Sequence, residues 1–411
     1  MSSRSPSRRG IDLWSLASFI GLGLPDGMLG TAWPSMRAGL HLPLGDLGLI
    51  LIMVTIGSVL VSSIVGRALR RFGLPALLTI SGATAAMGAI GFAGANELPM
   101  LLGLSLCFGV SAGITDGTLN TALALAGRQR LLNLLHGFYG IGASTGPLLI
   151  TATVLLGSWR DGYIALACYD IVAAIAWLRL PSAYATLKTG RPQDATKPVS
   201  DGTSDYTTGI QRTRSLRSAI LWSLATFFIY VGLEVAAGQW ETSYLRLYLH
   251  LSPLFAGVAT FSYWGALTVT RISLASFRRA LNNRSIVHLG AALGLVCTAM
   301  IWWNPNIAVT ILSFIALGAA LAGIFPALVA LTPERVDPRR APHLIAWEIG
   351  AASAGGALLS GGVGLILSKA GLGSFGFSLV LLAICLNLSA HIVERTSTHR
   401  TPSPQRLRQK S

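Results

Sequence analysis

The sequence predicts an all-α membrane protein with twelve transmembrane helices. Hydrophobic residues make up 52 % of the 411 residues and charged residues only 11 %, whereas a soluble domain is charged at about a quarter of its positions. Apolar runs of roughly 20 residues, long enough to cross about 30 Å of hydrocarbon, recur along nearly the whole chain. The runs are continuous rather than alternating at period two, which argues against a β-barrel.

Short connections that carry charge, Pro or Gly separate the apolar runs, with one much longer polar stretch after the sixth run. In chain order, we expect the spans at residues 12–34, 46–66, 75–95, 98–126, 132–156, 161–180, 217–245, 253–274, 285–303, 306–332, 342–368 and 372–393.

The net charge of +15 could suggest a nucleic-acid-binding protein, but its distribution indicates a membrane topology. Every second connection is basic, while the opposite connections hold only Arg37, Arg160, Arg246 and Lys369. Basic residues stay on the cytoplasmic side of a membrane. We therefore expect a multi-pass protein of the cell (inner) membrane, with both termini cytoplasmic, the lipid bilayer as its surroundings and no nucleic-acid partner.

The polar stretch divides the predicted helices six and six. Residues 181–216 are rich in Pro, Gly, Ser, Thr and charge, and they predict a flexible cytoplasmic linker. An N-terminal half at 1–180 and a C-terminal half at 217–394 follow, with a cytoplasmic tail at 395–411.

The two halves resemble each other at an offset of about 210 residues. LPDGMLGTAW aligns with GLEVAAGQW, so that Asp26 falls on Glu234, and GIGASTGPLL aligns with GAASAGGALL. Gly57 falls on Gly265, and AGI at 112–114 on AGI at 322–324. Four matches in order indicate a duplicated six-helix unit.

Acidic side chains are rare inside the spans, where each charge costs roughly 2.5 kcal/mol or more unless it faces a cavity or a partner. We single out Asp26, Asp116, Glu234 and Glu348, with Asp170 as a less central candidate. Asp26 lies between Pro25 and Gly27, which predict a bend in the helix. It either meets interfacial water near the outer end of the first helix or faces a central cavity.

Glu234 lies well inside the seventh span, with Tyr230, Gln239 and Trp240 nearby in sequence. Apolar surroundings disfavour the charged form of a carboxyl group, so Glu234 is a candidate for taking up and releasing a proton. The alternative is a structural hydrogen bond to a neighbouring helix. The three neighbours are candidate substrate-binding residues.

Asp116 and Asn120 are four residues apart and share one helix face, where they either serve the site or hold helices together. His136 could relay a proton. Tyr263 and Trp264 could stack on a ring-shaped ligand, and Trp347 with Glu348 repeats the pairing of an aromatic side chain with an acid. We expect Arg271 to snorkel to the cytoplasmic surface or to bind an acid in a loop.

These segments carry a family resemblance. YVGLE with GQW, AGITDGTLN, NLLHGFYGIGASTGP, YWGALTVTR and GIFPALVALTPERV together resemble the fucose/galactose/glucose:proton symporter branch of the major facilitator superfamily, among its bacterial relatives of sodium-dependent glucose transporters. The resemblance implies two six-helix halves, with acids of helices 1 and 4 in proton coupling and sugar binding. Asp116 falls at the helix 4 acid of the family and Asn120 at its accompanying asparagine. Asp26 lies about one helical turn away from the family's helix 1 position, where Gly30 falls instead.

No motif for catalysis is present: the chain has no P-loop, no metal-ligand spacing and no nucleophile motif. We therefore expect a transporter rather than an enzyme, without cofactor or metal, that works as a monomer on an ion gradient. The leading hypothesis is proton symport of a small polar solute, foremost a sugar, with sodium as another possible coupling ion. The alternative is a proton-antiport exporter of a drug or secondary metabolite. Asp26, Asp116, Glu234 and His136 are the candidates for proton coupling.

Overall fold

The computed structural model describes residues 6–180, 206–276, 282–336 and 340–398, and these residues form helices and short connections without a β-strand. The first six helices are α1 (Pro6–Leu40), α2 (Asp46–Phe72), α3 (Leu74–Gly94), α4 (Leu98–Leu125), α5 (Gln129–Leu156) and α6 (Trp159–Arg179). The others are α7 (Tyr206–Leu247), α8 (Pro253–Ser276), α9 (Asn283–Trp303), α10 (Ile307–Leu321), α11 (Ile324–Arg335), α12 (Ala341–Ala370) and α13 (Phe375–Thr398), with a short 3₁₀ turn η2 (Leu372–Ser374).

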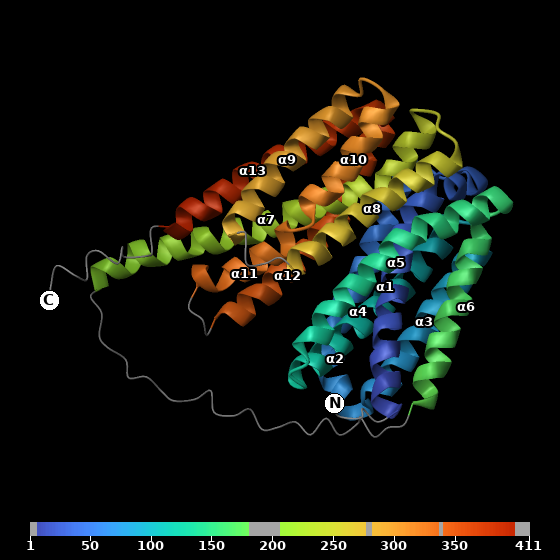
Figure 1. Cartoon of the computed structure of the whole chain (residues 1–411), viewed down its shortest axis with the longest axis horizontal. Coiled ribbons are helices and arrows are strands. Elements are labelled where there is room, and N and C mark those ends of the chain that lie inside the picture. The colour runs from blue at the N-terminus through green and yellow to red at the C-terminus, as the bar shows by residue number, and fades with distance from the viewer. Residues whose placement is uncertain (1–5, 181–205, 277–281, 337–339, 399–411) are drawn as a thin grey trace.

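These helices confirm the predicted fold of twelve long helical spans in two halves. Among the described residues, ten helices are long and apolar enough to cross a membrane, with α10 and α11 counted as one. The other two spans, α1 and α8, are not in that set because Asp26 and prolines interrupt α1 and because α8 is rich in Gly, Ser and Thr. Both nevertheless pack inside the bundle (Figure 1).

One expectation on local structure needs correction. The apolar part of α7 spans Arg217–Leu247, as expected for the seventh span, but the helix itself begins at Tyr206, so the last part of the expected linker is helical. Residues 181–205, like the tail beyond 398, lie outside the described residues. α1 is continuous through both Pro25 and Pro34, and the bend expected beside Asp26 stays a prediction.

The two halves repeat one packing scheme, as the duplicated sequence segments predict. In the first half α1 packs on α5, α2 on α4 and α3 on α6; in the second, α7 packs on α12, α8 on α10 and α9 on α13. Gly142 of α5 lies against the backbone oxygen of Ile20 on α1, and Gly355 of α12 lies in the same way against Phe228 on α7. Both contacts let two helix backbones approach closely.

The halves contact each other mainly at one end of the bundle. There Gly48 of α2 touches Gly361 of α12, and Arg246 of α7 donates a hydrogen bond of 2.8 Å to Ser35 of α1. Toward the opposite end the two halves diverge (Figure 1). Helices α5 and α8, which belong to different halves, stay in contact over most of their length. Thr151 meets Gly257 near one end of the pair, and Gly137 meets Ile272 near the other.

Replacing Gly142 by alanine should destabilise the N-terminal half, because a Cβ at this position would lie 2.1 Å from the backbone oxygen of Ile20. We expect a loss of about 1–3 kcal/mol, typical of overpacking, measured as a lower thermal midpoint of the purified protein. Gly103→Ala is the matched control, since a Cβ there would meet nothing within 4 Å. Equal midpoints for the two variants would contradict the assigned close contact.

Candidate functional site

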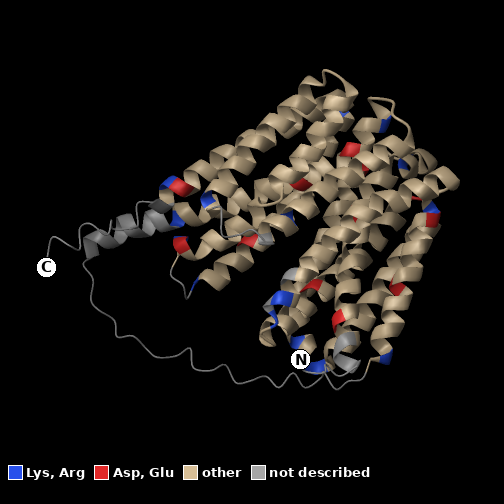
Figure 2. Ribbon diagram, viewed as in Figure 1, with Lys and Arg blue, Asp and Glu red and all other residues tan. Residues whose placement is uncertain are grey.

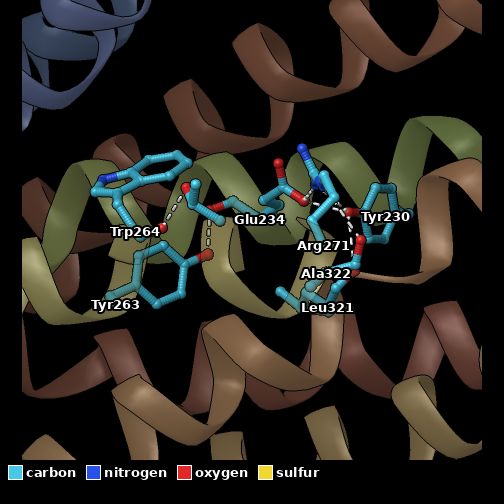
Figure 3. Close-up of polar contacts among 8 residues, drawn as sticks. Tyr230, Glu234, Tyr263, Trp264, Arg271, Leu321 and Ala322 are labelled. Atoms are coloured by element: carbon cyan, nitrogen blue, oxygen red, sulfur yellow. Dashed lines mark hydrogen bonds and ion pairs between the residues drawn. The ribbon is translucent and has the colours of Figure 1, made fainter. Parts of the chain in front are cut away.

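Glu234 of α7 lies at the centre of a hydrogen-bonded group in the C-terminal half (Figure 3). Arg271 of α8 donates through Nη2 to Glu234 Oε2 at 3.2 Å, and the Tyr230 hydroxyl donates to the same oxygen. Tyr263, fully buried, donates at 2.8 Å to the backbone oxygen of Glu234. Glu234 is therefore the anionic partner of an ion pair, and the expectation that Arg271 reaches the cytoplasmic surface or a loop is wrong.

A break in the tenth span anchors the same group. α10 ends at Leu321 and α11 begins at Ile324, which leaves backbone oxygens without helical partners. Arg271 Nε donates to the backbone oxygen of Ala322 at 3.2 Å, and the Tyr230 hydroxyl lies 3.0 Å from that of Leu321. Irregular backbone at membrane depth requires such partners inside the protein. The break therefore supplies acceptors for Arg271 and Tyr230, and these two side chains satisfy the backbone oxygens that the break leaves free.

Asp26 of α1 faces this group from the N-terminal half. The Tyr139 hydroxyl of α5 donates to Asp26 Oδ2 at 2.6 Å. Tyr139 is also close enough to interact electrostatically with both Glu234 and Arg271. Within the described part of the chain, Asp26 forms no ion pair with a basic side chain. The site thus joins a paired carboxylate in one half to an unpaired one in the other.

Asp116 and His136 extend the group toward the end where the halves diverge. Asn120 donates to Asp116 Oδ1 at 2.8 Å on α4, as their spacing predicts. Asp116 and His136 are exposed, and their charges interact, with Arg271 acting on His136 as well. Pairwise interactions therefore link the four residues predicted for proton coupling. His136 interacts with Asp116 and Arg271, and Arg271 pairs with Glu234. Tyr139 interacts with both Glu234 and Asp26.

Three predicted substrate-binding residues are enclosed between helices in this conformation. Gln239 Nε2 donates at 2.7 Å to the backbone oxygen of Asp26, and Trp240 Nε1 donates at 2.9 Å to that of Ser360 on α12. Trp264 packs against Gly238 and is 5 % exposed. These side chains fix how α7 packs, and their contact with a solute stays a prediction.

Glu348 and Trp347 lie elsewhere. Glu348 is fully buried and accepts hydrogen bonds from Ser223 and Thr332, with Arg335 at 3.7 Å. Ser223 precedes Glu234 on α7 by about 16 Å of helix. The structure therefore separates Glu348 from the site. Trp347, the preceding residue, is 71 % exposed rather than packed against the Glu234 group.

Sequence reasoning did not select Tyr139 or Arg271, which complete the site, nor Glu241 of α7. Glu241 is fully buried, and neither of its carboxyl oxygens has a hydrogen-bond partner among the described residues, although Thr260 faces it. The available signal was its place directly after Gln239 and Trp240 in an apolar run.

Comparison with known proteins supports this reading of the fold. Residues 15–303 match the family model described as Major Facilitator Superfamily. The chain is 24 % identical over 277 residues to "Bypass of stop codon protein 6" of Saccharomyces cerevisiae and 22 % identical over 269 residues to "Glucose/mannose transporter GlcP" of Bacillus subtilis. The first match covers 63 % of this chain and 55 % of the yeast protein, and the second covers 65 % of this chain and 65 % of GlcP. The chain thus spans less than two thirds of either relative's length.

Solved structures match nearly the whole chain at low identity. The nucleoside transporter NupG superposes with a TM-score of 0.72 and 14 % identity, over 97 % of this chain and 100 % of NupG. A bacterial homologue of the human lysosomal transporter Spinster, in an inward-facing and occupied conformation, has a TM-score of 0.69 and 13 % identity, over 98 % of this chain and 100 % of its own. At such identities the likeness shows the fold alone.

Arg271→Gln should destabilise the protein strongly, because it leaves the Glu234 carboxylate enclosed without its cation. Removing one partner of a buried ion pair costs about 3–5 kcal/mol, and the partial exposure of Arg271 places the expected loss at or below that range. The double variant Glu234→Gln/Arg271→Gln should recover part of the thermal midpoint. A double variant no more stable than Arg271→Gln would contradict direct pairing.

Glu241→Gln should leave the thermal midpoint unchanged or raise it. A fully buried carboxyl without a hydrogen-bond partner is tolerated only in its neutral form, which an amide imitates. The exposed Glu97, changed to Gln, serves as the control. A midpoint that falls by several degrees in Glu241→Gln alone would indicate an ionised Glu241.

Proposed function

The chain belongs to the major facilitator superfamily, and on that premise we propose that it is a secondary active transporter that moves a small polar solute together with protons. The observation that carries the proposal is the site between the halves, in which Asp26 and Tyr139 of one half face Glu234, Arg271 and Tyr230 of the other. A charge change there acts on both halves at once.

Asp26 is the first proton carrier in this proposal. Glu234 is already neutralised by Arg271, so protonating it requires breaking an ion pair. Asp26 has only a neutral hydroxyl donor, and an enclosed carboxylate without a cation gains from taking up a proton. Protonated Asp26 could then donate rather than accept, which would turn Tyr139 toward Glu234 and Arg271. His136 and Asp116 would pass protons between the exposed end and Asp26.

The open end of the bundle is cytoplasmic in this proposal. Lys and Arg lie mainly at the ends where α2 and α4 end and α5 and α9 begin, and fewer lie at the opposite ends (Figure 2). Since basic residues stay on the cytoplasmic side, the halves separate toward the cytoplasm and touch on the outer side. The protein would then be an inward-facing transporter of the cell membrane, with both termini inside.

A hydroxyl-rich solute such as a hexose suits the polar groups beside the ion pair. Asn120 Oδ1 and Trp264 Nε1 have no hydrogen-bond partner among the described residues, so each could bond to a solute hydroxyl once exposed. Glu234 and Arg271 offer an acceptor and donors of the kind that sugars use. The name of the Bacillus subtilis relative, a glucose/mannose transporter, supports the same solute class.

A drug or metabolite exporter that works by proton antiport is the second candidate. The tyrosines and tryptophan around Glu234 offer aromatic surface, while Asn120 is the one predicted binding amide near the exposed end. Such a set also fits an amphipathic solute. The two candidates predict opposite proton movements.

Proteoliposomes that contain a pH-sensitive dye test the proposal. Adding a hexose outside should acidify the lumen with wild-type protein, and Asp26→Asn should abolish this acidification without preventing solute binding. Asp161→Asn, at the exposed start of α6, is the control and should behave as wild type. Alkalinisation of the lumen on adding an amphipathic drug would contradict symport and favour the proton-antiport exporter. No proton movement with any solute would refute proton coupling.

A further inference from the structure

The N-terminal half contains a partly open cavity that no residue of the Glu234 group lines. It lies among α1, α2, α3, α4 and α6 and has a volume of about 80 Å³, with Asp26 and Asp170 in its wall. Because one buried water needs roughly 10–15 Å³ of such volume, the cavity has room for several water molecules. Asp26 is thus common to the cavity and to the site between the halves.

Asp170 of α6 faces this cavity without a partner. Its side chain belongs to a residue that is 5 % exposed, and Oδ2 has no hydrogen-bond partner among the described residues. Gly21 of α1 lies beside it: a Cβ there would be in ordinary van der Waals contact with Asp170 Oδ1, at 3.4 Å, and would crowd the neighbouring Tyr169 ring at 2.9 Å. In the part of the chain that the structure describes, no Lys, Arg or His side chain lines the cavity. A carboxylate in this place would be a buried charge without compensation.

The titratable groups around Asp170 do not supply that compensation. α1 presents Asp26, and its other acid, Asp12, is paired with Arg128 at 2.6 Å. α3, which is described over its whole length, carries no charged or titratable side chain. On α6 the neighbours are Tyr163 and Tyr169, and the Tyr169 hydroxyl donates to the backbone oxygen of Ala17.

The remaining helix that packs on α6 is α5. Its Tyr139 is bonded to Asp26, and its His136 packs edge-on against Phe19 of α1 at 5.7 Å between ring centres. Neither side chain lines the cavity.

We propose that Asp170 is a second proton-binding residue of this protein, which holds its proton in the present conformation and exchanges it with Asp26 through water in the cavity. The Asp26 carboxyl gives its proton to a water molecule of the cavity while that water gives a proton to the Asp170 carboxylate, so that the water stays neutral; the reverse transfer restores protonated Asp26. Asp26 then receives protons from two sides, from the cavity and from the exposed end of the bundle.

A sodium ion is the competing cation, and the cavity is a poor cage for it. Sodium would need several oxygens that are free to converge on one point. The hydroxyls of Ser81, Ser111 and Thr115 instead bond to one another, at 2.9 Å and 2.6 Å from Ser81. A proton needs no such cage.

This inference rests on the proposed function only in assigning the bound proton to transport. Proton binding at Asp170 itself is measured on the purified protein, without solute or ion gradient. Infrared spectra of the purified wild type should contain the carbonyl band of a protonated carboxyl group in apolar surroundings. The band should lose intensity in Asp170→Asn and keep it in Asp161→Asn, the exposed carboxyl of the same helix. Identical spectra for the three proteins would overturn the proposal, whatever the transport assay shows.

Carbodiimide labelling supplies a measurement on the wild type alone, in case Asp170→Asn does not fold. A protonated buried carboxyl group transfers its proton to a hydrophobic carbodiimide and then adds to its central carbon, so peptide mass spectrometry should find the label on Asp170, with less labelling as the pH rises. Labelling that sodium chloride suppresses and choline chloride does not would assign the site to sodium. That result would overturn the proton assignment.

Discussion

Enclosing a guanidinium group among apolar helices is the constraint on which the C-terminal half depends. Arg271 is tolerated there because Glu234, Tyr230 and the backbone oxygen of Ala322 accept its N–H groups. The backbone oxygen of Ala322 is free to accept from Arg271 because α10 and α11 are separate helices. One ion pair therefore joins α7, α8 and the broken tenth span, and any change in its protonation is a change in how those helices pack.

The two halves treat their acids differently although they share one packing scheme. In the C-terminal half Glu234 is paired with Arg271, and Glu348 with Arg335. In the N-terminal half Asp26 and Asp170 lie in one cavity wall that no basic side chain of the described residues shares. Since a proton is the simplest neutralising partner for an isolated carboxylate, the unpaired acids are the places for proton binding: Asp26 and Asp170 in the N-terminal half, and Glu241 in the C-terminal half.

Small residues decide where the halves can separate. Gly48 and Gly361 bring α2 and α12 into backbone contact at the closed end, whereas Leu60 of α2 and Trp347 of α12, farther toward the open end, are exposed. Contacts between α5 and α8 persist farther along the bundle, through Gly140 against Thr268. This arrangement allows one end to open while α5 and α8 remain together.

The sequence by itself determined the fold class, the two six-helix halves and the presence of a few acids at membrane depth. Each of these follows from local pattern: the length of apolar runs, repeated segments, and the rarity of charge in hydrocarbon. Helix ends were predicted less well where polar sequence remains helical, as at Tyr206. Only the tertiary structure decided which side chains contact each other across helices. Successive residues of a helix point in different directions, and their spacing does not say which helix lies opposite. Hence Arg271 meets Glu234 rather than a loop, Trp240 is enclosed against α12, and Glu348 belongs to another group.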